Sequence, residues 1–444
     1  MRQLLLSVSK RPKLAVGLII GIPLCISLLG LTLGREKIRL LNAASLLDER
    51  ISEAKRLGLP FDATELRPIG VTSETNVLST YEHIPWTYEQ TCDLPLYHNG
   101  NVAHKISNWR KREESSNIGI RPRAQFTRFD PGFEPHGRAD LRSQLVWDHV
   151  ERGGRLLVSE AITLAKQRKF DASLERFQQS VNMAHQISDD PRLETSSYHR
   201  LNLVADIIHA EPTLSFYFRN SPMHLRKLGE IKDSAPCDID LIRYLKWEFV
   251  QTLAIVCLYD QVGWPDANTI NDMDDFPLDP PTTFPTIPRG IISRGKLSVH
   301  IQASIETLNE LKKPGDFKEW GLRIGRIRSD LYNDKDGKKF DLPYAPILLA
   351  GQLETHKAMA LWAKEIVLQH GANLPDSLPA RKDPGIGKSI RYVKKGAKFW
   401  LYSDGWDGID QGGATNIPGA RPEKYQDDIL VTYPRDQAHY VYFW

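Results

Sequence analysis

The sequence predicts a mainly α-helical chain with a single N-terminal transmembrane helix, a helical-hairpin exported domain and a small C-terminal α+β module. Three observations predict this class: an uncharged apolar run near the N-terminus, helical apolar periodicity through the middle, and short extended runs separated by Gly, Pro and Asp after Ser389. The 444 residues are 41% hydrophobic and 25% charged, which is typical of globular protein with more than one domain. A net charge of +3 excludes a strongly basic, nucleic-acid-binding class.

The predicted membrane span runs from Leu14 to Gly34 and reads LAVGLIIGIPLCISLLGLTLG, with no charged residue. About 20 apolar residues suffice for a helix to cross about 30 Å of hydrocarbon. A cleaved signal peptide needs a small-residue cleavage site, and no good one precedes Gly34. A lipoprotein needs a small residue before the lipidated cysteine, whereas Leu24 precedes Cys25. We therefore expect an uncleaved anchor rather than either of these or a buried core helix.

The orientation of this span follows from the basic residues on its two sides. Four precede it (Arg2, Lys10, Arg11 and Lys13) and three follow it (Arg35, Lys37 and Arg39). Because cytoplasmic flanks carry the excess of Lys and Arg, the N-terminus is expected in the cytoplasm and the bulk of the chain outside it. The predicted location is the cell (inner) membrane, with a single pass and a periplasmic or extracytoplasmic remainder.

Helical patterns follow the span in order. Residues 38–59 carry an apolar stripe that we expect to be buried (Leu41, Leu46, Leu47, Ile51, Ala54 and Leu57), and 60–137 are rich in Pro, Gly and aromatic residues. The 141–187 segment predicts a helical hairpin that turns at KQRKFD and is similar to one tetratricopeptide unit, with Phe170 and Phe177 in its seam. Further helices are predicted at 194–218, 239–262, 297–311 and 346–370, the last ending at Gly371.

Two acidic loops are candidates for cation binding. The Pro-rich segment 263–290 favours a solvated loop, although its carboxylates are of the type that binds a cation. After the extended runs IRYVKK and KFWLYS, the segment SDGWDGIDQGG and then DDILVTYP place several Asp residues around glycines. Calcium prefers carboxylate and carbonyl oxygens on such curling loops. Asx-rich hairpin turns without a metal are the other interpretation of this segment, and both stay open.

The C-terminal pattern also resembles a known family. The run from Leu349 to Pro434, a helix followed by LPDSL, IRYVKKGAKFWLYSDGWDGIDQGG and DDILVTYP, resembles the C-terminal half of type II secretion major pseudopilins. That resemblance implies a helix on a small sheet with a calcium-binding loop. Its implied ligands are Asp407, Asp427 and Asp428, completed by Ser403 or a nearby backbone carbonyl, with Asp410 as a further candidate. No prepilin leader is present, so we do not expect a pilus subunit.

A broader resemblance covers more of the chain. ISEAKRLGLPFDATELRP, AKQRKFDASLERFQQSVNMAHQI and the terminal loop together resemble membrane-anchored bacterial proteins of planctomycete-like lineages, which have no established activity to lend. The expected organisation is a cytoplasmic tail (1–13), a transmembrane helix (14–34), a helix with an irregular linker segment (35–140), an α-helical domain (141–343) and a pseudopilin-like α+β module (344–444).

Motifs for enzymatic chemistry are weak. DPGIGKS ends like a phosphate loop, but Lys382 stands where the first glycine of that motif belongs, so the segment predicts a turn. His209 near Glu211 is expected to be a packed or surface residue rather than a ligand. The sequence has no HExxH, GxSxG or CxxC. Cys92, Cys237 and Cys257 leave open one disulfide or three buried thiols.

The function predicted from these observations is that of a non-enzymatic interaction or scaffold protein of the cell envelope with a calcium-stabilised C-terminal loop. Its partners would be membrane lipid through residues 14–34 and a protein of the envelope, with no nucleic acid. Two alternatives remain: an accessory component of a type II secretion or pilus-like system, and a hydrolase with an unrecognised site.

Overall fold

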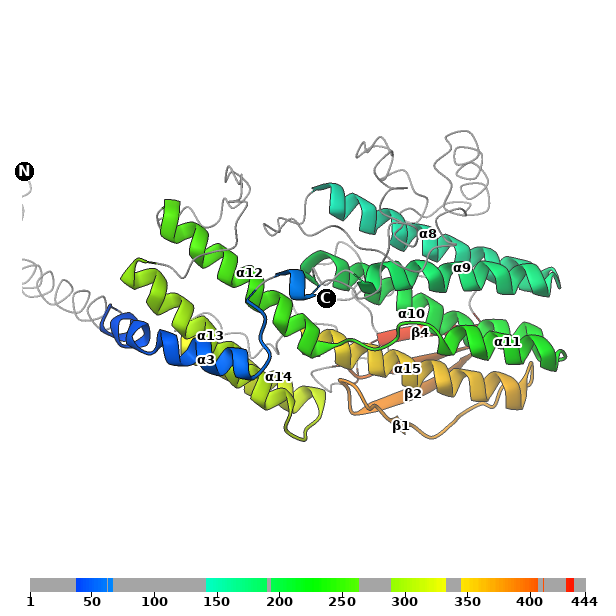
Figure 1. Ribbon diagram of the computed structural model, residues 1–444. Coiled ribbons are helices and arrows are strands. Elements are labelled where there is room, and N and C mark those ends of the chain that lie inside the picture. The colour runs from blue at the N-terminus through cyan, green and yellow to red at the C-terminus, as the bar shows by residue number, and fades with distance from the viewer. Residues whose placement is uncertain are drawn as a thin grey trace, which may run out of the picture. The chain divides into compact units, whose positions relative to one another are not determined.

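The computed structural model describes residues 37–61, 63–66, 141–189, 193–262, 289–332, 345–405, 410 and 429–434. These residues form a mainly helical structure with a four-stranded antiparallel sheet, which confirms the predicted combination of helices and a small sheet (Figure 1). The chain divides into two compact units, one of Met1–Phe61 with Gln251–Ile305 and one of Asp62–Val250 with Glu306–Trp444. Each unit is described by itself below.

The elements follow the predicted order closely. The helices are α3 Leu47–Arg56, α8 Leu141–Lys166, α9 Phe170–Asp189, α10 Leu193–Phe218, α11 Pro222–Asp233, α12 Leu241–Val262, α13 Ile291–Leu311, α14 Phe317–Tyr332 and α15 Ala345–His370, with a short 3-10 helix at Ala63–Leu66. The strands are β1 Arg381–Lys382, β2 Ser389–Lys395, β3 Lys398–Ser403 and β4 Ile429–Tyr433. Helices α11 and α14 and strand β1 are absent from the sequence prediction.

In the first unit, the apolar stripe predicted for residues 38–59 is only partly correct. Residues 37–45 are helical, a turn at Leu46 interrupts the helix, and α3 begins at Leu47. Leu47, Ile51 and Ala54 are buried as predicted, whereas Leu41 and Leu46 are exposed. The buried face continues through the turn at helical spacing, as Leu40, Ala44, Leu47, Ile51 and Ala54, whereas Leu41 and Leu46 each stand one position away from it.

The same unit holds α13 very close to residue 40. A Cβ added to Gly295 would lie 2.4 Å from the backbone oxygen of Leu40, so only glycine permits this approach. Further along, the Arg50 guanidinium donates hydrogen bonds to the carbonyl and the hydroxyl oxygen of Ser298, at 3.0 and 2.9 Å. Helices 37–45 and α3 therefore pack directly on α13.

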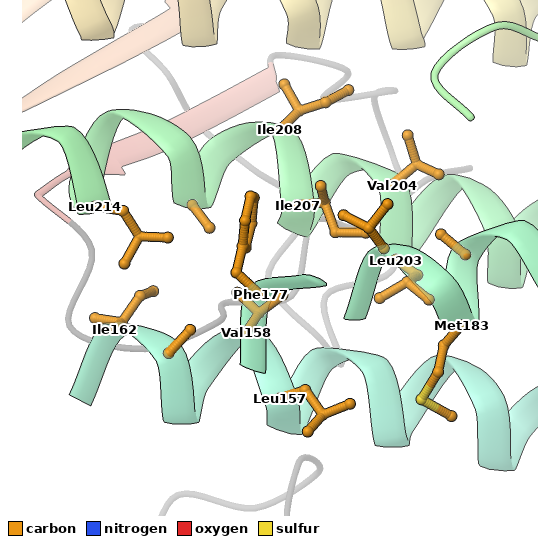
Figure 2. Close-up of a cluster of buried hydrophobic side chains, with 14 of the residues drawn as sticks. Leu157, Val158, Ile162, Phe177, Met183, Leu203, Val204, Ile207, Ile208 and Leu214 are labelled. Carbon is orange, nitrogen blue, oxygen red and sulfur yellow. The ribbon is translucent and has the colours of Figure 1, made fainter. Parts of the chain in front are cut away.

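The second unit begins with the predicted hairpin of α8 and α9. The turn between them contains Arg168 at φ +60°, and the Ser173 hydroxyl donates a hydrogen bond to the Ala161 carbonyl across the hairpin. Phe177 is fully buried in the seam, while Phe170 packs edge-on against Phe218 with ring centroids 4.9 Å apart. Figure 2 shows Phe177 among side chains of α8 and α10. The predicted seam residues are thus in the core.

Helix α10 lies at the centre of this unit, between the α8–α9 hairpin and α15 (Figure 1). Residues 203–215 of α10 are all buried, so the helix has no solvent face along this stretch. Leu349, Leu353 and Ala360 of α15 belong to the same apolar cluster as α8 to α11. The core therefore continues across the sequence position at which the α-helical domain and the C-terminal module were divided.

Strands β1 to β4 pair in sequence order, all antiparallel. Alternate side chains of the strands are buried and join Met359, Trp362, Ala363, Ile366 and Val367 of α15 in one cluster; these strand residues are Ile390, Tyr392, Phe399, Leu401, Val431 and Tyr433. This is the period-2 burial expected of a sheet with one face covered by a helix. Phe399 and Tyr433 stack across β3 and β4 with centroids 5.3 Å apart.

A buried charge cluster joins α8 to α10. The Arg155 guanidinium donates to Asp206 at 2.6 Å and to Glu151 at 3.1 Å, and Arg155 is only 1% exposed. Two carboxylates surround one guanidinium here, in a region from which water is excluded. Breaking such a pair leaves a charge that has lost both its hydration and its partner, at a cost of about 3–5 kcal/mol.

Several sequence predictions lie outside the described residues. They include the 14–34 span, the 263–288 part of the acidic loop, and residues 67–137 of the linker segment. Within the described part of the chain, no helix is long and apolar enough to cross a membrane. Cys237 is described as a free thiol whose pKa is raised by burial, and the disulfide question for Cys92 and Cys257 stays open.

Replacing Asp206 tests the buried charge cluster. We expect Asp206→Ala to lower the stability of the second unit by about 3–5 kcal/mol, because Arg155 loses its shortest charged contact. Urea unfolding of the full chain in detergent, followed by tryptophan fluorescence, measures this loss. Glu175→Ala is the matched control, since it removes an exposed partner of Arg176 worth about 0–1 kcal/mol. Equal shifts for the two variants would contradict the assignment.

Candidate functional site

The candidate site is the loop between β3 and β4, where the sequence predicts calcium binding. The register pairs Ser403, the last residue of β3, with Ile429, the first residue of β4. The two ends of the intervening segment are therefore held side by side by the sheet. Acidic residues stand at both ends in the sequence, with Asp404 directly after Ser403 and Asp428 directly before Ile429.

Ser403 lies in the interior at this closure. Its hydroxyl donates a hydrogen bond to Asp383 Oδ2 at 2.5 Å and accepts one from the Gly405 N–H at 3.2 Å. The side chain is fully buried. In this arrangement the hydroxyl stabilises the end of β3, and its predicted role as a calcium ligand stays a prediction.

Asp410 is the other predicted ligand among the described residues. Its carboxylate accepts a hydrogen bond from the Tyr402 hydroxyl at 3.2 Å and lies 3.1 Å from Arg391 Nε. Both partners come from neighbouring strands, β3 and β2. Asp410 thus connects the start of the loop to side chains on the face of the sheet opposite α15.

The remaining predicted ligands, Asp407, Asp427 and Asp428, lie outside the described residues. Over the ranges that are described, no group of three or more His, Cys, Asp or Glu side chains is arranged to hold a metal ion. The calcium site therefore stays a prediction. The observation that supports this prediction is the pairing of Ser403 with Ile429, which holds the two ends of the loop together.

A polar turn at Asp383 is hydrogen-bonded to Ser403, the residue at which β3 ends. Asp383 Oδ1 accepts hydrogen bonds from Thr355 Oγ1 at 2.7 Å and from the Gly385 N–H at 2.8 Å, while Oδ2 accepts them from Ser403 Oγ and the Gly387 N–H. A carboxylate that accepts four donors is fully occupied as an acceptor. Asp383 thereby joins α15, the turn and the end of β3.

The DPGIGKS segment forms this turn, which confirms the sequence prediction. Asp404 Oδ1 accepts the N–H groups of Lys388 and Ser389 at 2.7 and 2.9 Å, so a second carboxylate caps the same turn. A Cβ on Gly385 would lie 2.0 Å from the carbonyl oxygen of Gly351, which fixes glycine at that position. The motif is a structural turn packed on α15, with its N–H groups directed at carboxylates rather than at a phosphate.

A second cluster of chemistry-bearing side chains is buried where α10, α15 and β4 meet. His209 Nδ1 lies 2.5 Å from the Tyr433 hydroxyl, and His209 Nε2 lies 2.7 Å from His356 Nδ1. All three side chains are fully buried. Two arrangements of the protons satisfy both contacts with neutral imidazoles. In one, the Tyr433 hydroxyl donates to His209 Nδ1 and His209 Nε2 donates to His356 Nδ1. In the other, His356 Nδ1 donates to His209 Nε2 and His209 Nδ1 donates to the Tyr433 hydroxyl oxygen.

Glu211 adds a third polar connection along α10. Its carboxylate lies 2.5 Å from Lys364 Nζ on α15, and Glu211 is itself buried. Asp206 thus contacts Arg155 on α8. His209 contacts Tyr433 on β4 and His356 on α15, and Glu211 contacts Lys364 on α15. The polar side chains of α10 connect it to each of its main neighbours.

Sequence reasoning identified some of these residues and missed others. His209 was expected to be packed or on the surface, and the structure confirms it as packed. The sequence indicates Asp383 only as part of a turn. Nothing in the neighbouring residues predicts that its carboxylate accepts four hydrogen bonds. His356 and Tyr433 were missed, because they are 147 and 224 positions from His209 and meet it only in the folded chain.

Asp383→Asn tests the polar turn. All four partners of Asp383 are hydrogen-bond donors. In the Asn variant, the NH2 group replaces one carboxylate oxygen and cannot accept a hydrogen bond from the donors that faced it. We expect this isosteric change to cost about 2–3 kcal/mol and to raise amide hydrogen exchange across residues 381–405. Asp376→Asn, at an exposed carboxylate paired with Lys394, is the control and should change exchange little. Unchanged exchange in both variants would show that the turn does not depend on Asp383.

Comparisons with known proteins complete the description of the site. Neither the protein-family models, nor the curated proteins, nor the solved structures gave a match to this chain. The chain is accordingly described by its own geometry: a helical core centred on α10, and a sheet on α15 that closes an acidic loop.

Proposed function

We propose that this chain is a membrane-anchored extracytoplasmic protein that acts by holding a protein partner in the cell envelope, with a calcium-binding loop in a pseudopilin-like C-terminal module. The observation that carries the proposal is the pairing of Ser403 with Ile429, which brings the two ends of the acidic loop together on a sheet backed by α15. A loop closed in this way can bring together carboxylate and carbonyl oxygens, which are the ligands that calcium prefers.

The use of the buried polar side chains supports an interaction role over catalysis. Asp383 and Asp404 accept hydrogen bonds from N–H groups of the turn, and the Ser403 hydroxyl donates a hydrogen bond to Asp383. His209 and His356 connect α10 to α15 and β4. These side chains have stabilising partners within the protein, so we assign them structural roles and assign the function to the protein's surface and loop.

A role as an accessory component of a type II secretion or pilus-like system is the second candidate. A 26-residue helix, α15, lies along one face of a small antiparallel sheet and is followed by the loop between β3 and β4. The resemblance of the C-terminal sequence to major pseudopilins implies this same order of elements. The partner in that case is a component of the secretion machine.

Calcium addition tests the loop. We expect calcium to raise the melting temperature of the full chain in detergent, because an ion that binds only the native state stabilises it by about 2.7 kcal/mol at about a hundred times Kd. The double variant Asp407→Ala with Asp428→Ala should lose this rise, whereas Asp376→Ala should keep it. Differential scanning fluorimetry with and without a chelator measures the effect. A melting temperature that calcium does not move would reject the ion site.

Carbonate extraction tests the anchor. Membranes from cells that express the full chain should retain it at high pH, since a spanning helix is held by its apolar length. The variant Ile20→Arg with Ile22→Arg should be released, because each arginine at the centre of a span costs about 2.5–3.5 kcal/mol. Leu5→Arg, outside the predicted span, is the control and should be retained. Release of the unmodified chain would rule out the anchor.

A further inference from the structure

Two helical segments lie side by side in the first unit. One runs through residues 37–45 and the other is α13, which begins at Ile291; a Cβ added to Gly295 of α13 would lie 2.4 Å from the backbone oxygen of Leu40. Ile38 and Leu41 are within three positions of Leu40, and Ile291 and Ile292 are within four of Gly295. These four side chains therefore belong to one end of the packed helix pair.

This end of the helix pair presents large apolar side chains to solvent. The exposed fractions are 59% for Ile38, 39% for Leu41, 54% for Ile291 and 46% for Ile292. The opposite sides of the same helical turns are buried, with Leu40, Ala43, Ala44 and Leu297 in the interior. Two packed helical segments that both expose isoleucine near the contact of Leu40 with Gly295 place more apolar surface in one region than a single scattered residue would.

The charged side chains among the described residues here are basic, while Glu36 directly precedes Lys37 in the sequence. Residues 37–47 and 289–305 contain five basic side chains and no Asp or Glu; the basic residues are Lys37, Arg39, Arg289, Arg294 and Lys296. The first acidic residue along the helices is Asp48, whose carboxylate lies 3.7 Å from Arg294. Lys37, Arg289 and Lys296 are exposed beside the isoleucines. We call this set (Ile38, Leu41, Ile291 and Ile292 with Lys37, Arg289 and Lys296) the helix-start surface.

We propose that the helix-start surface lies on the headgroup region of an anionic lipid bilayer. Apolar side chains that enter the interface and basic side chains that pair with anionic headgroups are the two components of surface attachment to membranes. Lys37 follows Gly34, the end of the predicted span, by three positions, so the bilayer is the nearest occupant available to this surface. The inference rests on the proposed anchor and adds a second, peripheral contact that fixes the first unit against the membrane.

Photocrosslinking in vesicles tests this contact on the full chain. The photoreactive residue p-benzoylphenylalanine replaces Ile291 or Ile38, and Ser52 in α3 serves as the matched exposed control. Ser52 is 14 positions beyond Ile38, about 20 Å along the helices at about 1.5 Å per residue. The chain is reconstituted in vesicles of phosphatidylethanolamine with phosphatidylglycerol, or of phosphatidylcholine alone, and mass spectrometry counts lipid adducts.

We expect several-fold more lipid adducts at positions 291 and 38 than at 52, and fewer on the neutral vesicles. Equal yields at all three positions, in a chain that carbonate does not release, would overturn the inference and leave the anchor in place. Equal yields on the two vesicle types would overturn the anionic preference. Release of the chain by carbonate would instead remove the anchor, and the surface proposal with it.

Discussion

The burial of α10 on every side is the constraint on which the second unit depends. A helical stretch without a solvent face must pair its ionisable side chains within the protein, since an unpaired buried charge costs several kcal/mol. Asp206, His209 and Glu211 meet this requirement by reaching out of the helix to α8, β4 and α15. Apolar packing sets how closely the neighbours approach, and these three polar contacts set where along α10 each neighbour sits.

The sheet depends on α15 in a similar way. One face of the strands packs on the apolar side of α15, and the turn at Asp383 connects the same helix to β3 through Thr355 and Ser403. Glycines at 385 and 387 permit the turn to approach α15 and β3 at distances that a Cβ would block. The helix therefore positions the sheet, and the sheet in turn sets the two ends of the acidic loop.

Much of this architecture follows from sequence periodicity. The β2, β3 and β4 segments are short runs of residues typical of strands, separated by Gly, Pro and Asp, and the long apolar patterns of α10 and α15 reflect their central positions. Helix α11 and strand β1 were missed because few of their side chains are buried: Leu228 is the buried residue of α11, and both residues of β1 are exposed. The predicted stripe was wrong at Leu41 and Leu46 because each lies next to, and not on, the 3–4 spaced set of buried residues that includes Leu40, Ala44 and Leu47.

The polar sites were less predictable than the elements that carry them. Asp383 stands in a motif whose glycines and Pro indicate a turn, but nothing local reveals that Thr355 and Ser403 supply two of its four donors. His209 meets Tyr433 and His356 only because three elements converge. Periodicity reports the average side of a helix or strand that is buried, whereas these contacts depend on the register between elements distant in sequence.

The pairing of Ser403 with Ile429 also determines how the connection between them depends on its length. Because both ends are held by the sheet, the entropic cost of closing this loop grows by only about 0.6 kcal/mol for each doubling of length. Added residues after Asp410 therefore carry a small closure cost, while Asp404 and Asp410 keep their contacts with the turn and with Tyr402. A protein built in this way can acquire a new ligand or partner at that position without rebuilding its core.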